Sequence, residues 1–66
     1  MKVTMFATLT EQEDGYDGTI EITREDVPDL QTLAHAVTDF TVAVGFCYVK
    51  AVGYECKNGE MIWGDL

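Results

Sequence analysis

The chain has 66 residues, of which 47% are hydrophobic, and its twelve acidic and four basic side chains give a net charge of −8. This length predicts one small domain with a marginal core, and the hydrophobic fraction argues against a disordered chain. The charge disfavours direct binding to nucleic acid or to an anionic membrane surface. No stretch reads as a secretory signal or reaches membrane-spanning length, so we expect a cytoplasmic protein.

The first two elements are predicted strands. Residues 2–10 alternate, with Val3, Met5, Ala7 and Leu9 on one face, and residues 18–24 repeat the alternation with apolar isoleucines. Between them lies EQEDGYDG, residues 11–18, whose glycines and aspartates are typical of a turn. A calcium loop is the weaker interpretation, because the acids do not follow the EF-hand series. Contact with a partner is a third possibility for this loop.

A helix is predicted over residues 28–44. Apolar residues recur there at helical spacing: Leu30, Leu33, Ala34, Val37, Phe40, Thr41 and Val44. Pro28 suits a first helical turn, either Asp26 or Asp29 suits the N-cap, and Gly45 stands where a C-capping glycine is expected.

The remaining residues predict a hairpin that turns at Asn58-Gly59, a pair typical of a two-residue type I′ turn. A central turn pairs residues 57 with 60, 56 with 61, 55 with 62 and 54 with 63. The element order is then ββαββ. We predict an α+β fold in one domain, residues 1–66, with a four-stranded antiparallel sheet and the helix packed on one of its faces.

In this register the second hairpin has one face of small residues and one of large aromatic residues. One helix covers only one face, so either the helix packs on the aromatic residues or they form an interface. We favour an interface, because exposed Tyr, Trp and Met are enriched at such surfaces. Its predicted residues are Tyr48, Val52, Tyr54, Met61 and Trp63. Self-association as a homodimer, through a sheet face or an edge, is the partner we expect first.

Few residues suggest catalytic chemistry. His35 and Asp39 stand four apart on the helix and share a face, but no nucleophile accompanies them at a recognisable spacing. Cys47 and Cys56 form no zinc pattern and are expected to be reduced residues that fill the core. We therefore predict no catalytic residue, no metal site, no cofactor and no enzymatic activity.

Acidic residues are concentrated in the first half of the chain. Eight of the twelve lie between residues 11 and 29: Glu11, Glu13, Asp14, Asp17, Glu21, Glu25, Asp26 and Asp29. These residues could bind a partner by steering the protein electrostatically toward a basic protein surface, as a mimic of nucleic acid does. The simpler interpretation, which we favour, is a solvated acidic surface.

The C-terminal half resembles small open reading frames of tailed bacteriophages, in which a helix ends in a GF-x-YV step and leads into a hairpin. The matching residues are Gly45, Phe46, Tyr48 and Val49 and the closing Trp63-Gly64-Asp65. The resemblance covers under half of the chain and includes no active-site residue. It implies an accessory protein that acts stoichiometrically, by binding a host factor of defence or regulation.

The leading functional hypothesis is thus a small acidic, non-enzymatic binding protein, phage-encoded and dimeric, that occupies a host protein in the host cytoplasm. An oligomer that binds a nucleotide-like signal between its subunits is an alternative, although lysine and arginine are scarce. A structural or assembly protein is the third hypothesis.

Overall fold

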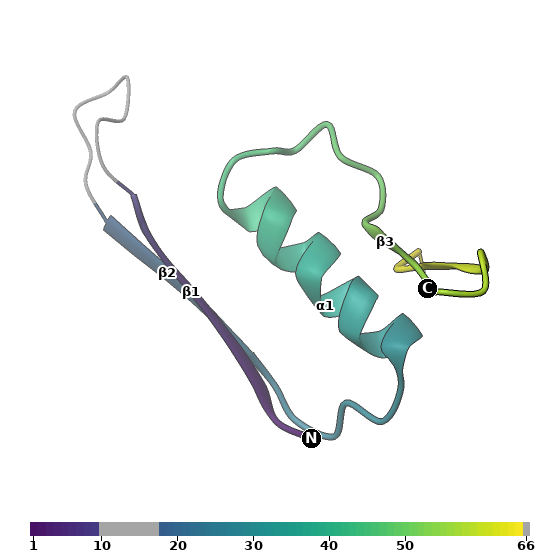
Figure 1. The fold of residues 1–66 in the computed structure, drawn as a ribbon. Coiled ribbons are helices and arrows are strands. Elements are labelled where there is room, and N and C mark those ends of the chain that lie inside the picture. Colours follow the sequence, from purple (N-terminus) through teal and green to yellow (C-terminus); the bar gives the residue numbers. More distant parts are fainter. Residues whose placement is uncertain (10–17, 66) are drawn as a thin grey trace.

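The computed structural model describes residues 1–9 and 18–65 and has the predicted element order (Figure 1). Its elements are β1 (Val3–Leu9), β2 (Gly18–Arg24), α1 (Leu30–Ala43), β3 (Gly53–Glu55) and β4 (Met61–Trp63). The α+β class is confirmed. The single four-stranded sheet is wrong, because β1 pairs with β2 and β3 with β4 in two separate two-stranded sheets.

The first hairpin follows the alternation of its sequence. β1 and β2 are antiparallel and pair Leu9 with Gly18 and Val3 with Arg24. Val3, Met5, Ala7 and Leu9 are half-buried, whereas the threonines and Phe6 between them are exposed. The turn and calcium-loop interpretations of EQEDGYDG concern residues 11–17, which lie outside the described part, and Gly18, which is the first residue of β2.

Both ends of α1 are capped by side-chain or backbone groups. Asp29 is the N-cap, with extended backbone, and its carboxylate accepts a hydrogen bond of 2.8 Å from the Thr32 amide. Pro28 therefore precedes the helix and does not lie in its first turn. At the other end, Gly45 has φ of 124°, and the amides of Gly45 and Phe46 donate to the carbonyls of Val42 and Thr41. This is a Schellman motif, and it confirms the predicted glycine C-cap.

The helix lies between the two hairpins and packs against both of them (Figure 1). Its buried residues are small: Ala34, Ala36 and Thr38. Two of these, Ala36 and Thr38, lie outside the predicted apolar stripe. They are buried because the helix is covered on more than one side. Because the helix lies between the two hairpins, their strands do not join into one sheet. The core is correspondingly thin, and no large side chain is fully buried among the described residues.

Candidate protein-binding surface

The C-terminal hairpin presents different faces from those predicted. Gly53 pairs with Trp63, Tyr54 with Ile62 and Glu55 with Met61, one residue away from the expected register. A shift of one residue moves side chains to the opposite face of a strand pair. Trp63 and Met61 therefore share a face with Gly53 and Glu55.

Glycine at position 53 makes room for the indole of Trp63. A Cβ built on Gly53 would lie 2.6 Å from Cε3 of Trp63, so the ring lies directly over the glycine. Half of the Trp63 side-chain and backbone surface nevertheless remains exposed. The ring is thus fixed by its own hairpin and still available for contact.

The five predicted interface residues do not form one surface. Met61 and Trp63 are exposed together on one face, whereas Tyr54 lies on the other face and is half-buried. Val52 is half-buried as well, and its amide donates to Thr38 Oγ1 at 2.9 Å. Tyr48 lies in the connection between α1 and β3 and is 80% exposed. Tyr48, Met61 and Trp63 are thus exposed, but the single aromatic face that was predicted is not formed. The interface itself stays a prediction.

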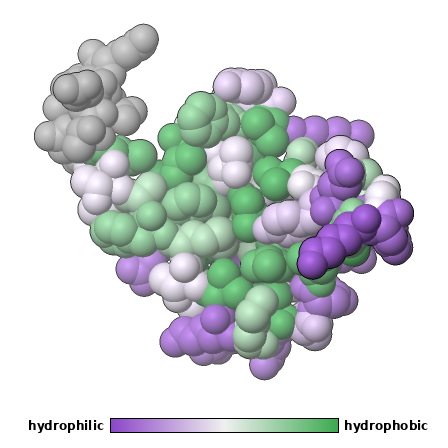
Figure 2. All heavy atoms as spheres, viewed as in Figure 1, coloured by the Kyte–Doolittle hydropathy of each residue, from purple (hydrophilic) through white to green (hydrophobic). Residues whose placement is uncertain are grey.

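An open groove joins Met61 and Trp63 to the first turn of α1. It has a volume of about 420 Å³ and is lined by Asp29, Leu30, Gln31, Met61, Ile62 and Trp63. A neighbouring groove of about 460 Å³ is lined by Met1, Val27, Pro28, Asp29, Leu30 and Leu33. Both are lined by Asp29 and Leu30, which form a shared border. Figure 2 shows that hydrophobic residues gather over the middle of one face, with hydrophilic residues at its lower and right margins.

Asp29 places a negative charge at the border of the two grooves. Hydrogen bonds from the Thr32 side chain and backbone lower the pKa of the Asp29 carboxyl, so the group is ionised at neutral pH. Its position at the N-cap also complements the helix dipole. The grooves thus combine an apolar floor with a charge whose place is fixed by the helix.

The predicted acidic surface is described for four of its eight residues. Glu21, Glu25, Asp26 and Asp29 are all exposed. Glu21 lies on the outer face of the first hairpin, opposite Phe6, and the other three lie between β2 and α1. The remaining four, Glu11, Glu13, Asp14 and Asp17, lie outside the described residues.

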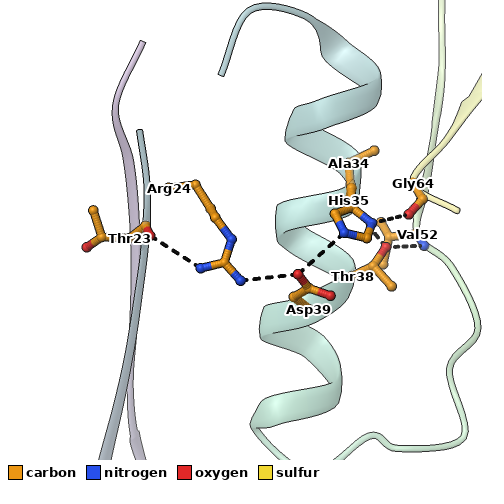
Figure 3. Close-up of polar contacts among 8 residues, drawn as sticks. All are labelled: Thr23, Arg24, Ala34, His35, Thr38, Asp39, Val52 and Gly64. Carbon is orange, nitrogen blue, oxygen red and sulfur yellow. Dashed lines mark hydrogen bonds and ion pairs between the residues drawn. The ribbon is translucent and has the colours of Figure 1, made fainter. Parts of the chain in front are cut away.

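His35 and Asp39 belong to a chain of polar contacts that crosses the molecule (Figure 3). Arg24 of β2 forms an ion pair of 3.2 Å with Asp39, which lies 3.6 Å from His35 Nε2. His35 Nδ1 donates to the carbonyl of Gly64 at 2.9 Å, because a carbonyl only accepts. The pair, for which no catalytic role was predicted, therefore links the first hairpin to the segment that follows β4.

Neither cysteine forms a disulfide, but their burial differs from the prediction. Cys47 is exposed in the α1–β3 connection, so it does not fill the core, and Cys56 is half-buried. Within residues 1–9 and 18–65, no group of three His, Cys, Asp or Glu side chains could hold a metal ion. The basic residues Lys2 and Lys50 are exposed and far apart in sequence, and Arg24 is engaged by Asp39.

Two exposed apolar residues, Leu30 and Phe46, were missed from the sequence, whereas a third, Phe6, was not. Leu30 was assigned to the apolar stripe of the helix, yet it lines both grooves and is 37% exposed. Phe46 contacts Tyr48 edge-to-face, with ring centroids 6.2 Å apart, and was noted only within a motif. Phe6 is 59% exposed at the centre of β1. Leu30 fits the helical spacing of the apolar residues, so its exposure could not be recognised from the sequence. Phe6 alternates with the apolar residues of β1, so the sequence already placed its ring on the polar face.

Comparison with protein-family models, with curated proteins and with solved structures found no match to this chain. In the described part of the chain, no helix is long and apolar enough to cross a membrane.

Proposed function

We propose that this protein is a small acidic, non-enzymatic binding protein that acts stoichiometrically, as a dimer, on a basic protein of a bacterial host. The observation that carries the proposal is the groove between α1 and β4. Trp63 and Met61, which are 50% and 42% exposed, stand there beside Leu30 and the fixed charge of Asp29. Aromatic and methionine side chains in a groove with a polar border are the usual composition of a protein-binding hot spot.

The acidic residues of the first half of the chain, of which Asp29 lines the groove, define the kind of partner. Residues 1–29 contain eight acidic and two basic side chains, hence a net charge of −6. Such a concentration raises association rates with positively charged surfaces and repels phosphate backbones. The resemblance to small phage proteins supports a partner within a bacterial host, of defence or of regulation.

The test is a pulldown of bacterial lysate with the tagged chain and two charge-matched variants. Met61→Lys inserts a charge into the groove, and the hairpin tolerates it because Glu55 lies directly opposite. Val42→Lys is the control, since Val42 is 38% exposed at the end of α1 and does not line the groove. Both variants carry the same net charge.

We expect one basic protein to be retained at low salt by the wild type and by Val42→Lys. Met61→Lys should bind it at least about tenfold more weakly, which is the scale of a hot-spot residue. Equal binding by both variants would show that the groove is not the binding site. If no protein were retained under any salt condition, the proposed function would be contradicted.

A further inference from the structure

Within the described part of the chain, strand β1 has an unpaired edge that lacks the usual protection. Among the described residues β1 pairs with β2 alone, so its other edge has no strand beside it. Natural sheets protect such edges with charges, prolines, bulges or very short strands. β1 has seven residues, VTMFATL, with no charge and no proline, and its pairing with β2 is continuous. An edge of this kind is suited to pairing with another strand.

The backbone groups that face this edge belong to Thr4, Phe6 and Thr8. Met1 exchanges two hydrogen bonds of 2.9 Å with Val27 on the β2 side. Backbone groups alternate in direction along a strand, so the even-numbered residues direct theirs to the free edge. The hydroxyls of Thr4 and Thr23 lie 3.2 Å apart. This short distance supports the same assignment, because side chains lie closer at pairs whose backbones are not hydrogen-bonded to each other.

We propose that two copies of this chain pair antiparallel through β1, with the two-fold axis at Phe6. This inference rests on the dimer included in the proposed function and specifies its surface. Phe6 is the central residue of Val3–Leu9, so a two-fold axis there pairs the whole strand. Across the two copies Phe6 then faces Phe6, and the other pairs are Met5 with Ala7, Thr4 with Thr8 and Val3 with Leu9.

This pairing matches the side chains on both faces of the sheet. On the outer face, the exposed Phe6 ring gains an aromatic neighbour, and cross-strand aromatic pairs stabilise sheets. On the inner face, large Met5 meets small Ala7, and the two half-buried rows join into one apolar surface. Both helices then cover the same side of a continuous four-stranded sheet, in the order β2-β1-β1-β2.

The other edge of the hairpin does not suit the same pairing. The central residue of β2, Gly18–Arg24, is Glu21, so a two-fold axis there would place two glutamates directly opposite. Like charges at such a pair are destabilising. In the β1 pairing the two β2 strands are instead separated by about 14 Å, three strand spacings, which exceeds the Debye length of about 8 Å at physiological salt. The charge of Glu21 therefore disfavours dimer pairing through β2 and favours pairing through β1.

The thin core explains why a second copy is the occupant. Domains of this size are usually stabilised by disulfides, a metal or oligomerisation. Here both cysteines are free, and the buried hydrophobic residues of the described chain are Val27, Ala34 and Ala36. A self-complementary strand supplies the missing apolar contact whichever host protein is present.

The first experiment measures mass by light scattering over a dilution series of the wild type and two variants. Phe6→Lys places two like charges at the two-fold axis, yet within each copy the lysine faces Glu21, which preserves the hairpin. Thr19→Lys adds the same charge on the outer face of β2 and is the control. We expect the wild type and Thr19→Lys to have twice the 7.3 kDa mass of the chain. The dissociation constant of Phe6→Lys should rise at least about tenfold.

A mixture supplies an independent check. Phe6→Glu combined with Glu21→Lys, which keeps an opposite-charge pair inside each hairpin, should also weaken the dimer. An equimolar mixture of this double variant with Phe6→Lys should recover the dimer, because opposite charges then meet at the axis. A monomeric wild type at millimolar concentration, or a dimer unaffected by Phe6→Lys, would overturn the proposal. Loss of the dimer in Thr19→Lys as well, with circular dichroism unchanged, would also count against a β1 interface.

Hydrogen exchange tests the wild type without any substitution. The amides of Thr4, Phe6 and Thr8 should be protected in concentrated protein and exchange faster on dilution. The amides of Met5 and Ala7, which face β2, should be protected throughout as internal controls. Rapid exchange of Thr4, Phe6 and Thr8 in protein of dimeric mass would overturn the β1 pairing. Met61→Lys should leave both measurements unchanged, so a failed host pulldown and a failed dimer remain distinguishable.

Discussion

Gly64 brings the C-terminal segment into close contact with the helix. Its carbonyl accepts from His35, its amide donates to the Val52 carbonyl at 2.9 Å, and a Cβ built there would overlap the Ala34 backbone. Gly64→Ala should therefore lower the free energy of unfolding by about 1–3 kcal/mol, the usual cost of overpacking a close contact. Urea denaturation measures this loss.

Gly18→Ala is the matched control for Gly64→Ala, because a Cβ at Gly18 meets no atom within 4 Å. Its stability should stay close to that of the wild type. If the two alanine variants were equally stable, the close approach of Gly64 to the helix would not contribute to stability.

Sequence reasoning found Gly45 but missed the role of Gly64. A glycine after the last apolar residue of a helix is a local signal, because only the few preceding residues decide the C-cap. Gly64 is required by the Ala34 backbone, thirty residues earlier in the chain, and no local pattern encodes that contact. His35 shows the same limit, since its i, i+4 partner Asp39 was predictable and its carbonyl partner was not.

At the scale of the helix, the N-cap predicts a dependence on pH. Hydrogen bonds from Thr32 lower the pKa of Asp29 in the folded chain. A carboxyl whose folded pKa lies below its unfolded value of about 3.9 stabilises the fold above that value, and loses its contribution as pH falls through the folded pKa. Relative to Asp29→Ala, the wild type should therefore melt at a higher temperature at pH 7, and the difference should shrink below pH 4.

Asp29→Asn is the control for this titration. Asparagine also caps helices but does not ionise, so its melting temperature should exceed that of Asp29→Ala by the same amount at pH 7 and at pH 2. Thermal melts followed by circular dichroism at 222 nm provide the comparison. A difference between the wild type and Asp29→Ala that does not change with pH would show that the carboxylate charge is not what caps α1.

The C-terminal hairpin shows how far a strand pair is predictable from its turn. The hairpin and its location follow from Asn58-Gly59, but the loop has three residues, since the Cys56 amide donates to the Glu60 carbonyl at 2.8 Å and Glu55 pairs with Met61. Among non-glycine residues described, only Asp26 has positive φ, so Asn58 does not adopt the type I′ geometry. Its side chain instead accepts from the Glu60 amide at 3.0 Å. Two-residue and three-residue loops use the same dipeptide, and the choice changed the register and the face of Trp63.

At the scale of the whole molecule, the element order was predictable and the arrangement of the sheets was not. Periods of two and 3.6 residues mark the strands and the helix whatever they pack against. Whether four strands form one sheet depends on which sides of the helix they cover. Ala36 and Thr38, which lie off the main apolar stripe, were the available signal that α1 is covered on more than one side.

The charge of the whole chain predicts how stability depends on salt. With a net charge of −8, repulsion among carboxylates opposes the folded state, whereas the ion pair of Asp39 with Arg24 is partly exposed and contributes little. Raising NaCl from about 10 to 200 mM shortens the Debye length from about 30 Å to less than 10 Å. The melting temperature should therefore rise over this range, as measured by circular dichroism.

The same salt series should be run on Phe6→Lys, in which dimer pairing is weakened. A rise in both proteins would assign the effect to repulsion within one chain, and a fall in both would show that ion pairs dominate. The direction also bears on the proposed basic partner. If salt raises the melting temperature, a basic protein that is released from the wild type at high salt is released by screening of the acidic residues and not by unfolding of the groove between α1 and β4.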